Sequence, residues 1–262
     1  MFEAIVLADS LNTATGDRLT TLQLTYPRFI HAELLTHRMF SRNTASSRAI
    51  PVEKMIEAAV TNPAAPIYWG SNKAGMQAGA EVAEPENAHT AWLHARDAAV
   101  AQARSLASLK LHKQIVNRVL EPFLWHTAIV SATEWDNFFK LRLHPDAQPE
   151  MQELAKHMIG ALDSSEPKPV FPASWHLPLI FPEDQELNLE TQRKLSTARC
   201  ARVSYLTHDG RRDIQADLDL HDRLAASGHW SPFEHVAQPV SESKFIGNFR
   251  GFRQYRKQIE GA

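Results

Sequence analysis

The chain reads HRMFSRNTASSR from His37 to Arg48, with one histidine, three arginines, three serines and an asparagine in twelve residues. It follows an apolar run at residues 29–35, which predicts a buried helix over residues 27–40 with Pro27 near its first turn. Guanidinium and backbone N–H groups bind anions, so the stretch predicts an anion site. The alternative is a helix C-terminus with favourable cations and a serine-rich turn.

The composition is that of an ordinary globular protein, with 262 residues, 44% hydrophobic residues and a net charge of −2. A balanced charge gives no basic field for nucleic acid, which is therefore not expected as a partner. One cysteine, Cys200, excludes a disulfide within the chain and fits a cytoplasmic location. The sequence shows no signal pattern and no long apolar run, so no membrane contact is expected.

The pattern along the chain predicts both strands and helices. Residues 2–8 and 19–24 have strand composition, and the polar stretch between them predicts a hairpin. The predicted helices after the first cover residues 52–60, 89–111, 116–130, 134–143, 148–162, 187–205 and 214–227. Thr133 and Asp136 predict a capping box for the fourth of these, and Gly228 predicts the end of the last.

Three stretches break this pattern. Residues 61–85 are rich in Gly, Pro, Asn and Ala and predict an excursion without packed elements. Residues 163–184, the proline-rich segment, predict a surface connection with Phe171 and Trp175 held in the core, or a domain boundary. Residues 245–257 alternate basic and aromatic side chains, which is typical of an amphipathic helix with a solvated cationic face; stacking on single-stranded nucleic acid is the alternative.

The usual catalytic motifs are missing from the sequence. Thirteen histidines invite a search for metal ligands, but no His-Glu-x-x-His or cysteine pair is present, and the dipeptides His208-Asp209 and His221-Asp222 lack companion ligands. We therefore expect no metal site. Cys200 is expected to be a small buried thiol, because its neighbour Arg199 does not face it on a helix. A glycine-rich phosphate loop is also missing.

Two groups of polar and charged residues are the candidates for a functional site. One is the stretch 37–48, and the other is His229-Trp230-Ser231-Pro232-Phe233-Glu234-His235. Together with Arg118 and Arg142 on predicted helices, they indicate a pocket for a large anionic ligand.

Four segments resemble the flavin-dependent thymidylate synthases. The family signature runs Arg-His-Arg, two residues, Ser, one residue, Asn-Glu, one residue, Ser-Gly-Arg. This chain has Thr36-His37-Arg38, Ser41, Asn43-Thr44 and Ser46-Ser47-Arg48 at these positions. The other matching segments are NRVLEP at 117–122, NFFKLR at 137–142 followed by Ala147-Gln148, and GHWSPFEH at 228–235.

The order of the segments is unusual, because in the family the Phe-Glu-His segment precedes the Arg-His-Arg segment. The resemblance therefore implies a circularly permuted, homo-oligomeric α/β protein of α+β type, with an antiparallel sheet and helices. We expect one domain over residues 1–262. Residues 1–162 would be the family's central and C-terminal part, 163–184 the new join and 185–262 the family's N-terminal part.

The resemblance also implies an activity. Such enzymes are homotetramers that bind FAD at subunit interfaces and methylate dUMP to dTMP with methylenetetrahydrofolate and NADPH, without a cysteine nucleophile. By position, Arg142 and Ser46 would be catalytic. Substrate would be bound by Glu33, Arg38, Ser46, Ser47, Arg48, Arg118 and Arg142. The flavin would be bound by His37, Arg38, Asn137, His229, Ser231 and Glu234.

Several positions depart from the family pattern. Thr36 and Thr133 stand where the family has arginine, Thr44 where it has Glu, Ser47 where it has Gly, and Glu33 where many members have Gln. We expect that an arginine of the C-terminal segment, Arg250, Arg253 or Arg256, compensates for the missing cations. These changes leave two alternatives open: methylation or hydroxymethylation of another pyrimidine nucleotide, and a nucleotide- or nucleic-acid-binding protein without catalysis.

Overall fold

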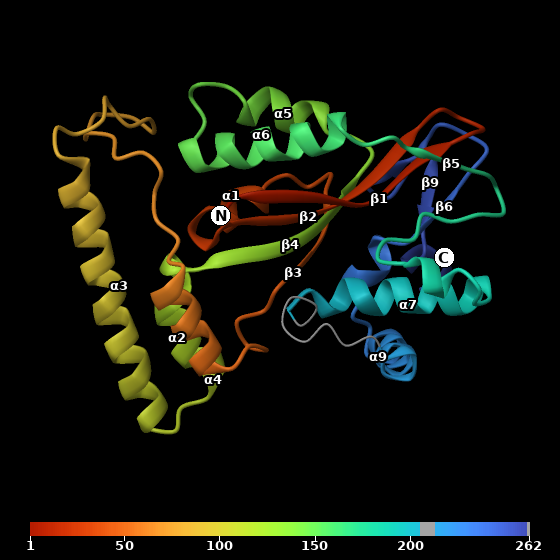
Figure 1. Cartoon of the computed structure of the whole chain (residues 1–262). Coiled ribbons are helices and arrows are strands. Elements are labelled where there is room, and N and C mark those ends of the chain that lie inside the picture. The colour runs from red at the N-terminus through yellow and green to blue at the C-terminus, as the bar shows by residue number, and fades with distance from the viewer. Residues whose placement is uncertain (205–212, 261–262) are drawn as a thin grey trace.

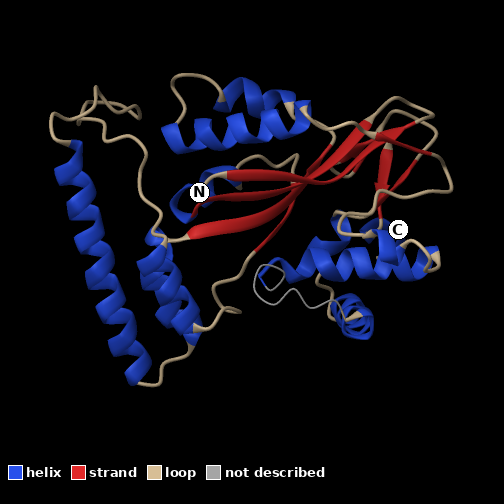
Figure 2. Cartoon of the chain, viewed as in Figure 1, coloured by secondary structure: helices blue, strands red, loops and turns tan. Residues whose placement is uncertain are grey.

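The computed structural model describes residues 1–204 and 213–260 and shows a mixed α+β architecture (Figure 1, Figure 2). The central sheet has five strands in the order β3-β4-β2-β1-β5. Neighbouring strands are antiparallel except β1 and β5, which run parallel. The strands are β1 (Glu3–Asn12), β2 (Arg18–Pro27), β3 (Ser41–Thr44), β4 (Trp125–Ala132) and β5 (Lys168–Val170).

The predicted hairpin is confirmed by β1 and β2, and both strands are longer than predicted. Asp9 was placed in the connection but lies in β1, because Arg18 and Thr20 on the paired strand hydrogen-bond to its carboxylate. The turn contains Gly16 at a φ of +77°, a conformation that glycine adopts without strain. Asn12 next to the turn donates to the carbonyls of Val240 and Gly251 and so connects the hairpin to the C-terminal segment.

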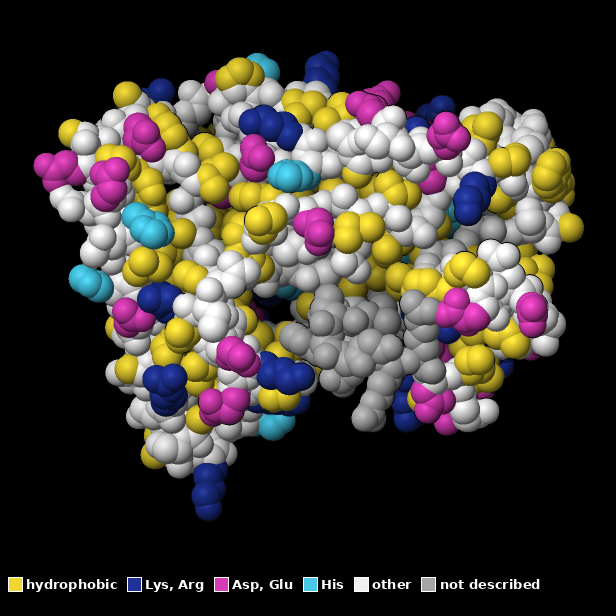
Figure 3. All heavy atoms as spheres, in the orientation of Figure 1, with side chains coloured by type: hydrophobic (Ala, Val, Ile, Leu, Met, Phe, Trp, Pro, Cys, Tyr) yellow, Lys and Arg dark blue, Asp and Glu magenta, His cyan; other side chains and the backbone are white. Residues whose placement is uncertain are grey.

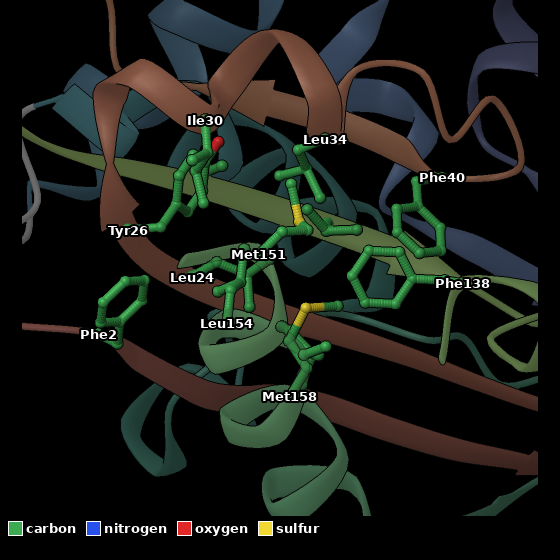
Figure 4. Packing of buried hydrophobic residues seen from close by; sticks show 14 of the residues in the cluster. Phe2, Leu24, Tyr26, Ile30, Leu34, Phe40, Phe138, Met151, Leu154 and Met158 are labelled. Carbon is green, nitrogen blue, oxygen red and sulfur yellow. The ribbon is translucent and has the colours of Figure 1, made fainter. Parts of the chain in front are cut away.

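One face of the sheet is covered by α1 (His31–Leu34), α5 (Asp136–Arg142) and α6 (Pro149–Asp163). The predicted apolar stripe of α6 is confirmed, since Met151, Leu154, Met158 and Leu162 are buried. Figure 4 shows Met151, Leu154 and Met158 packed near Leu24 of β2 and Leu34 of α1. Alternate residues of β2 and β4 point to this layer, as the two-residue period of a strand requires. They are Leu22, Leu24, Tyr26, Ala128, Val130 and Ala132.

The opposite face of the sheet packs against α7 (Leu189–Ala201) and the short 3-10 helix Arg202–Ser204, through Ile129, Cys200 and Val203. The next helix, α9 (Ile214–Ala226), lies against α7 and ends before Gly228, which has the positive φ predicted for it. Tyr205 at the end of a predicted helix, and the dipeptide His208-Asp209, lie outside the described residues.

A second helical group lies to one side of the sheet (Figure 1). It contains α2 (Val52–Thr61), the long α3 (Pro85–Ser108) and α4 (Lys113–Val116), and it has its own apolar cluster. The helix predicted over 52–60 is confirmed. The helix predicted over 89–111 begins earlier, at Pro85, because proline suits the first turn of a helix.

The helix predicted over residues 116–130 is wrong. The chain there forms the end of α4, a 3-10 helix at Asn117–Phe123, and then the strand β4. Pro122 has no backbone N–H and cannot continue a helix. Beyond it, Thr127, Ile129 and Val130 are β-branched, and β4 pairs with a strand on each side.

The helix predicted over residues 27–40 is also largely wrong. Only a 3-10 turn at Arg28–Ile30 and α1 form. The backbone hydrogen bonds that follow join residues three positions apart, as in turns. The side chain of Arg42 donates to the carbonyls of Leu35 and His37, which in a longer helix would accept from backbone N–H groups. The predicted serine-rich turn after it is partly the edge strand β3.

The C-terminal segment is not the predicted amphipathic helix. It forms β7 (Phe245–Ile246), β8 (Phe249–Arg250) and β9 (Phe252–Gln254), and β9 pairs with β6 (Ala237–Pro239). A single helical turn, α10 (Arg256–Ile259), follows. Alternating side chains suit strands: Phe252 and Gln254 are buried while Arg253 is exposed.

The proline-rich segment is partly packed, as β5 pairs with β1 in parallel. Trp175 is buried as predicted, but Phe171 is 59% exposed, so its predicted core position is wrong. The predicted capping box of Thr133 and Asp136 does not form, because Thr133 accepts a hydrogen bond from the backbone N–H of Arg250 instead. Within the described residues, no helix has the length and apolarity needed to cross a bilayer.

Candidate functional site

The centre of the candidate site is a hydrogen bond between Arg142 and His37. Arg142 lies in the last turn of α5, where a cation is favoured by the helix dipole. Its Nε donates to Nε2 of His37 at 2.8 Å, and its Nη1 lies 3.5 Å from Oε2 of Glu33. Three predicted site residues from two distant segments are therefore brought together.

His37 is held as a neutral ring. Burial, together with the nearby cations of Arg142 and Arg42, lowers its pKa to about 4. A neutral imidazole carries one unprotonated nitrogen that accepts a hydrogen bond. Accepting from Arg142 fixes the other nitrogen, Nδ1, as the protonated one. The ring also packs edge-on against Phe138.

Arg142 borders two cavities. The smaller, of about 240 Å³, is lined by His37, Arg38, Asn137 and Glu134 among others. The larger, of about 780 Å³, is lined by Glu33 and Gln148 among others, and will be called the large cavity. Arg142 can thus present its guanidinium to ligands on two sides.

The C-terminal segment, whose arginines were expected beside the site, contacts two residues that line the smaller cavity. Asn248 donates to the carbonyl of Arg38, and Arg250 pairs through Nε with Oε1 of Glu134 at 3.0 Å. The backbone N–H of Arg250 donates to Thr133, the position where the resembled family carries arginine. Glu134 and Asn248 were missed in the sequence; the alternation of basic and aromatic residues was the available signal for the segment.

A second group of predicted residues lies where the 3-10 helix Ser231–Glu234 meets β3. Ser231 donates to Oδ1 of Asn43 at 3.1 Å, and Glu234 pairs with Arg256 at 2.6 Å. The two motifs singled out in the sequence are therefore adjacent although 188 positions separate Ser231 from Asn43. His229 is exposed and bonds to Ser227 instead.

The remaining predicted residues form a third group. Arg118 is half exposed, pairs with Glu121 at 3.0 Å and lines a separate cavity of about 370 Å³ with His31. Asn117 beside it donates to the carbonyl of Ser47. Ser46 accepts from the backbone N–H of Arg48. The structure does not bring Ser46, Ser47, Arg48 or Arg118 to either cavity that Arg142 borders.

Other chemistries receive no geometric support. Cys200 is fully buried, which raises the pKa of its thiol and keeps it protonated. Across residues 1–204 and 213–260, no group of three His, Cys, Asp or Glu side chains could hold a metal ion. On the face shown in Figure 3, acidic and basic side chains are interspersed and form no basic patch.

Comparison with known proteins identifies the family. The family model described as thymidylate synthase complementing protein matches residues 19–168, more than half of the chain, and the chain belongs to this family. The match begins in β2 and ends at β5, so it includes Arg142, His37 and Glu33. No curated protein matches the chain.

Solved structures similar to this chain include two of a UMP/dUMP methylase, PolB, from Streptomyces cacaoi. The one bound with 5-Br dUMP is 17% identical, with a TM-score of 0.45, over 55% of this chain and 66% of that chain. The one bound with 5-Br UMP is 15% identical, with a TM-score of 0.46, over 62% of this chain and 88% of that chain.

Proposed function

We propose that the protein is a flavin-dependent enzyme that methylates C5 of a pyrimidine nucleotide, converting dUMP to dTMP with methylenetetrahydrofolate and NADPH. Membership of the thymidylate synthase complementing family supports it. The observation that carries it is the cationic guanidinium of Arg142, held by the neutral His37 at the border of two cavities. Such a fixed cation stabilises negative charge that develops on a pyrimidine ring.

The residues around the smaller cavity fit a flavin nucleotide. Arg38 makes no ion pair with any described residue, and Asn137 offers an amide, so a cation and a hydrogen-bonding group are available to an anionic dinucleotide. We propose that His37, Arg38 and Asn137 hold FAD together with His229, Ser231 and Glu234. When bound, FAD would supply the redox chemistry, with NADPH as the reductant.

We propose that the remaining residues bind substrate. Arg38, Ser46, Ser47, Arg48 and Arg118 would hold the nucleotide and its phosphate through cationic and hydroxyl groups. Glu33 and Arg142 would face the pyrimidine. Ser46 would act beside Arg142 at the reacting ring.

A homotetramer with shared sites would reconcile this assignment with the geometry. Within one chain, the residues around Arg142, those around Ser231 and those around Arg118 form three separate sets of contacts. A neighbouring subunit that supplied Arg118 and the 46–48 stretch would complete the site. If so, a monomer isolated by dilution should lose activity, which size-exclusion chromatography with a parallel assay would show.

We also propose that residues 1–262 are one circularly permuted domain. The contact between Ser231 and Asn43 supports this, because it puts the two family motifs side by side despite their reversed order. The proline-rich segment 163–184 would be the join between the parts at 1–162 and 185–262.

One observation favours a second candidate, a sibling enzyme that transfers methyl or hydroxymethyl to another pyrimidine nucleotide. Glu33 pairs with Arg142, so a carboxylate stands where many family members place an amide. A carboxylate accepts hydrogen bonds and does not donate them, which changes the edge of a base that it selects.

The test is a product assay on the flavin-loaded protein with dUMP, UMP and dCMP in turn. The proposal expects dTMP, NADPH oxidation and a visible flavin absorbance. Product from UMP or dCMP alone would favour the sibling enzyme. Binding of nucleotide without flavin binding or product would leave a binding protein, the third class.

A further inference from the structure

The segment between α2 and α3 forms an ordered hairpin, residues 67–82, coloured orange in Figure 1. Ser71 donates to the carbonyl of Ala80, and Gly79 donates back to the carbonyl of Ser71, both at 2.8 Å. Gly70 and Glu81 form an antiparallel bridge. The excursion predicted from composition is therefore closed by its own backbone hydrogen bonds.

A buried carboxylate anchors this hairpin to the sheet layer. Glu150, in the first turn of α6, is 3% exposed. Its Oε1 accepts from the backbone N–H of Ile67 and its Oε2 from Nε2 of Gln148, both at 2.9 Å. Burying a carboxylate is costly unless its oxygens are hydrogen-bonded, so these two bonds hold both partners in place. Ile67 and Gln148 both line the large cavity.

The hairpin is one wall of the large cavity, and Glu33 and Arg142 line the same space. Tyr68 contributes a ring, and its hydroxyl donates to the carbonyl of Gly79 at 3.0 Å, so the ring is fixed at its outer end. Gly70 leaves room for the ring, because a Cβ there would lie 2.8 Å from Cε1 of Tyr68.

We propose that the 67–82 hairpin selects the nucleotide substrate, with Tyr68 stacking on the base in the large cavity and Glu150 acting as the positioning residue for this wall. The inference rests on the proposed function and deepens it. A fixed aromatic ring and a fixed guanidinium in one cavity present a flat apolar face and a cation to the same ligand. A planar pyrimidine base on which negative charge develops has the two matching properties.

The first test measures binding of dUMP by titration calorimetry, with Tyr68→Ala, Tyr68→Phe and Glu150→Gln. Tyr68→Ala should raise the Kd about tenfold, as expected for loss of one base–aromatic stack, and Tyr68→Phe, which keeps the ring and loses its bond to Gly79, should raise it less. Glu150→Gln should also raise the Kd, because the amide cannot accept from both Ile67 and Gln148. Glu57→Gln, an exposed change on α2, is the matched control.

A second readout uses the exposed Lys73 within the hairpin. Trypsin should cut after Lys73 more slowly when dUMP fills the cavity, while cleavage after the exposed Lys110 at the end of α3 stays constant. In Glu150→Gln the protection by dUMP should be lost, although the thermal transition of the variant stays close to wild type. If Glu150 contributed only to overall stability, Glu150→Gln would change the rates of cleavage after Lys73 and after Lys110 together.

The outcomes separate this inference from the function on which it rests. If the wild type binds none of dUMP, UMP or dCMP, the proposed function fails. If it binds dUMP and Tyr68→Ala binds it equally well, the inference fails alone. If Tyr68→Ala weakens methylenetetrahydrofolate and leaves dUMP unchanged, the wall faces the other substrate and the inference is overturned.

Discussion

The Nε of Arg142 donates a hydrogen bond of 2.8 Å to Nε2 of His37, across 105 positions of sequence. The ring must be neutral to accept it, and burial beside two arginines lowers the pKa of His37 to about 4. The pair therefore consists of a permanent cation and a neutral acceptor that orients it. His37 thus orients Arg142 without neutralising its charge, and the nearby counter-charge is that of Glu33, 3.5 Å away.

Replacing Arg142 should reduce catalysis sharply. Arg142→Lys keeps a charge but loses the planar fork, so kcat should fall about 100-fold or more, as when one stabilising donor is removed. Steady-state assays of dTMP formation measure this. Lys140→Ala on the exposed side of the same helix is the control. An Arg142→Lys enzyme within threefold of wild type would contradict the assignment.

His37 should act through Arg142 as a positioning residue. His37→Gln retains a side-chain oxygen that accepts from Arg142, whereas His37→Phe retains only the ring shape. We expect His37→Gln to keep most of the kcat and His37→Phe to lose at least about tenfold, a low value for loss of an oriented group. Equal losses in both variants would show that packing of the ring, and not the hydrogen bond, is what matters.

The sequence predicted which residues belong to this site better than it predicted how they are arranged. The family resemblance marked His37, Arg142 and Glu33, but their pairing depends on where α1 ends, and the helix was predicted too long. Arg42 binds the carbonyls of Leu35 and His37 through its side chain, a contact that hydrophobic periodicity does not reveal.

The fold was predicted in the same uneven way. The hairpin and the stripe of α6 follow from local periodicity and are confirmed. The central strand β4 was read as helix, because a continuous apolar run has no period that separates a buried strand from a buried helix. The C-terminal strands were not predicted either, because β9 forms by pairing with β6, and the local sequence does not show this pairing.

Acid should destabilise the protein through two buried histidines. His176 bonds to Ser10 and Thr21, and His235 bonds to Ser131, and burial lowers the pKa of each to about 3. An unfolded histidine titrates near 6.5, so between about pH 6.5 and 3 the unfolded chain binds more protons and stability falls as the pH falls. Each histidine contributes a slope of about 1.4 kcal/mol per pH unit in the middle of this range.

Urea unfolding at several pH values between 4 and 7 measures this slope. Over most of this pH range the histidines are protonated in the unfolded chain and neutral in the folded protein. His176→Gln should make stability depend less on pH, while His94→Gln, an exposed change on α3, should leave the dependence unchanged. An unaltered slope in His176→Gln would mean that other groups control acid unfolding.

The buried cation Arg199 should be important for stability. It pairs with Asp184 and Asp217 and donates to the carbonyl of Leu179, so it connects the proline-rich segment to α7 and α9. Arg199→Ala would leave two buried carboxylates without this partner, at a cost of about 3–5 kcal/mol. Denaturant titration measures the loss, with the exposed Arg104→Ala as control. A loss below about 1 kcal/mol, typical of a surface ion pair, would contradict this role.

Arg250 should be the arginine that replaces the cation missing at Thr133. Its backbone contacts Thr133 and its guanidinium pairs with Glu134 at the cavity assigned to flavin, whereas Arg253 on β9 is exposed. Arg250→Ala should raise the Kd for FAD about fivefold to tenfold, in the range of one charge-assisted hydrogen bond, and Arg253→Ala should leave it unchanged. Flavin fluorescence titration measures both constants. If both variants bind FAD like wild type, neither Arg250 nor Arg253 supplies the missing cation. If both weaken it equally and the effect disappears at high salt, the segment acts through its overall charge and Arg250 has no specific place in the site.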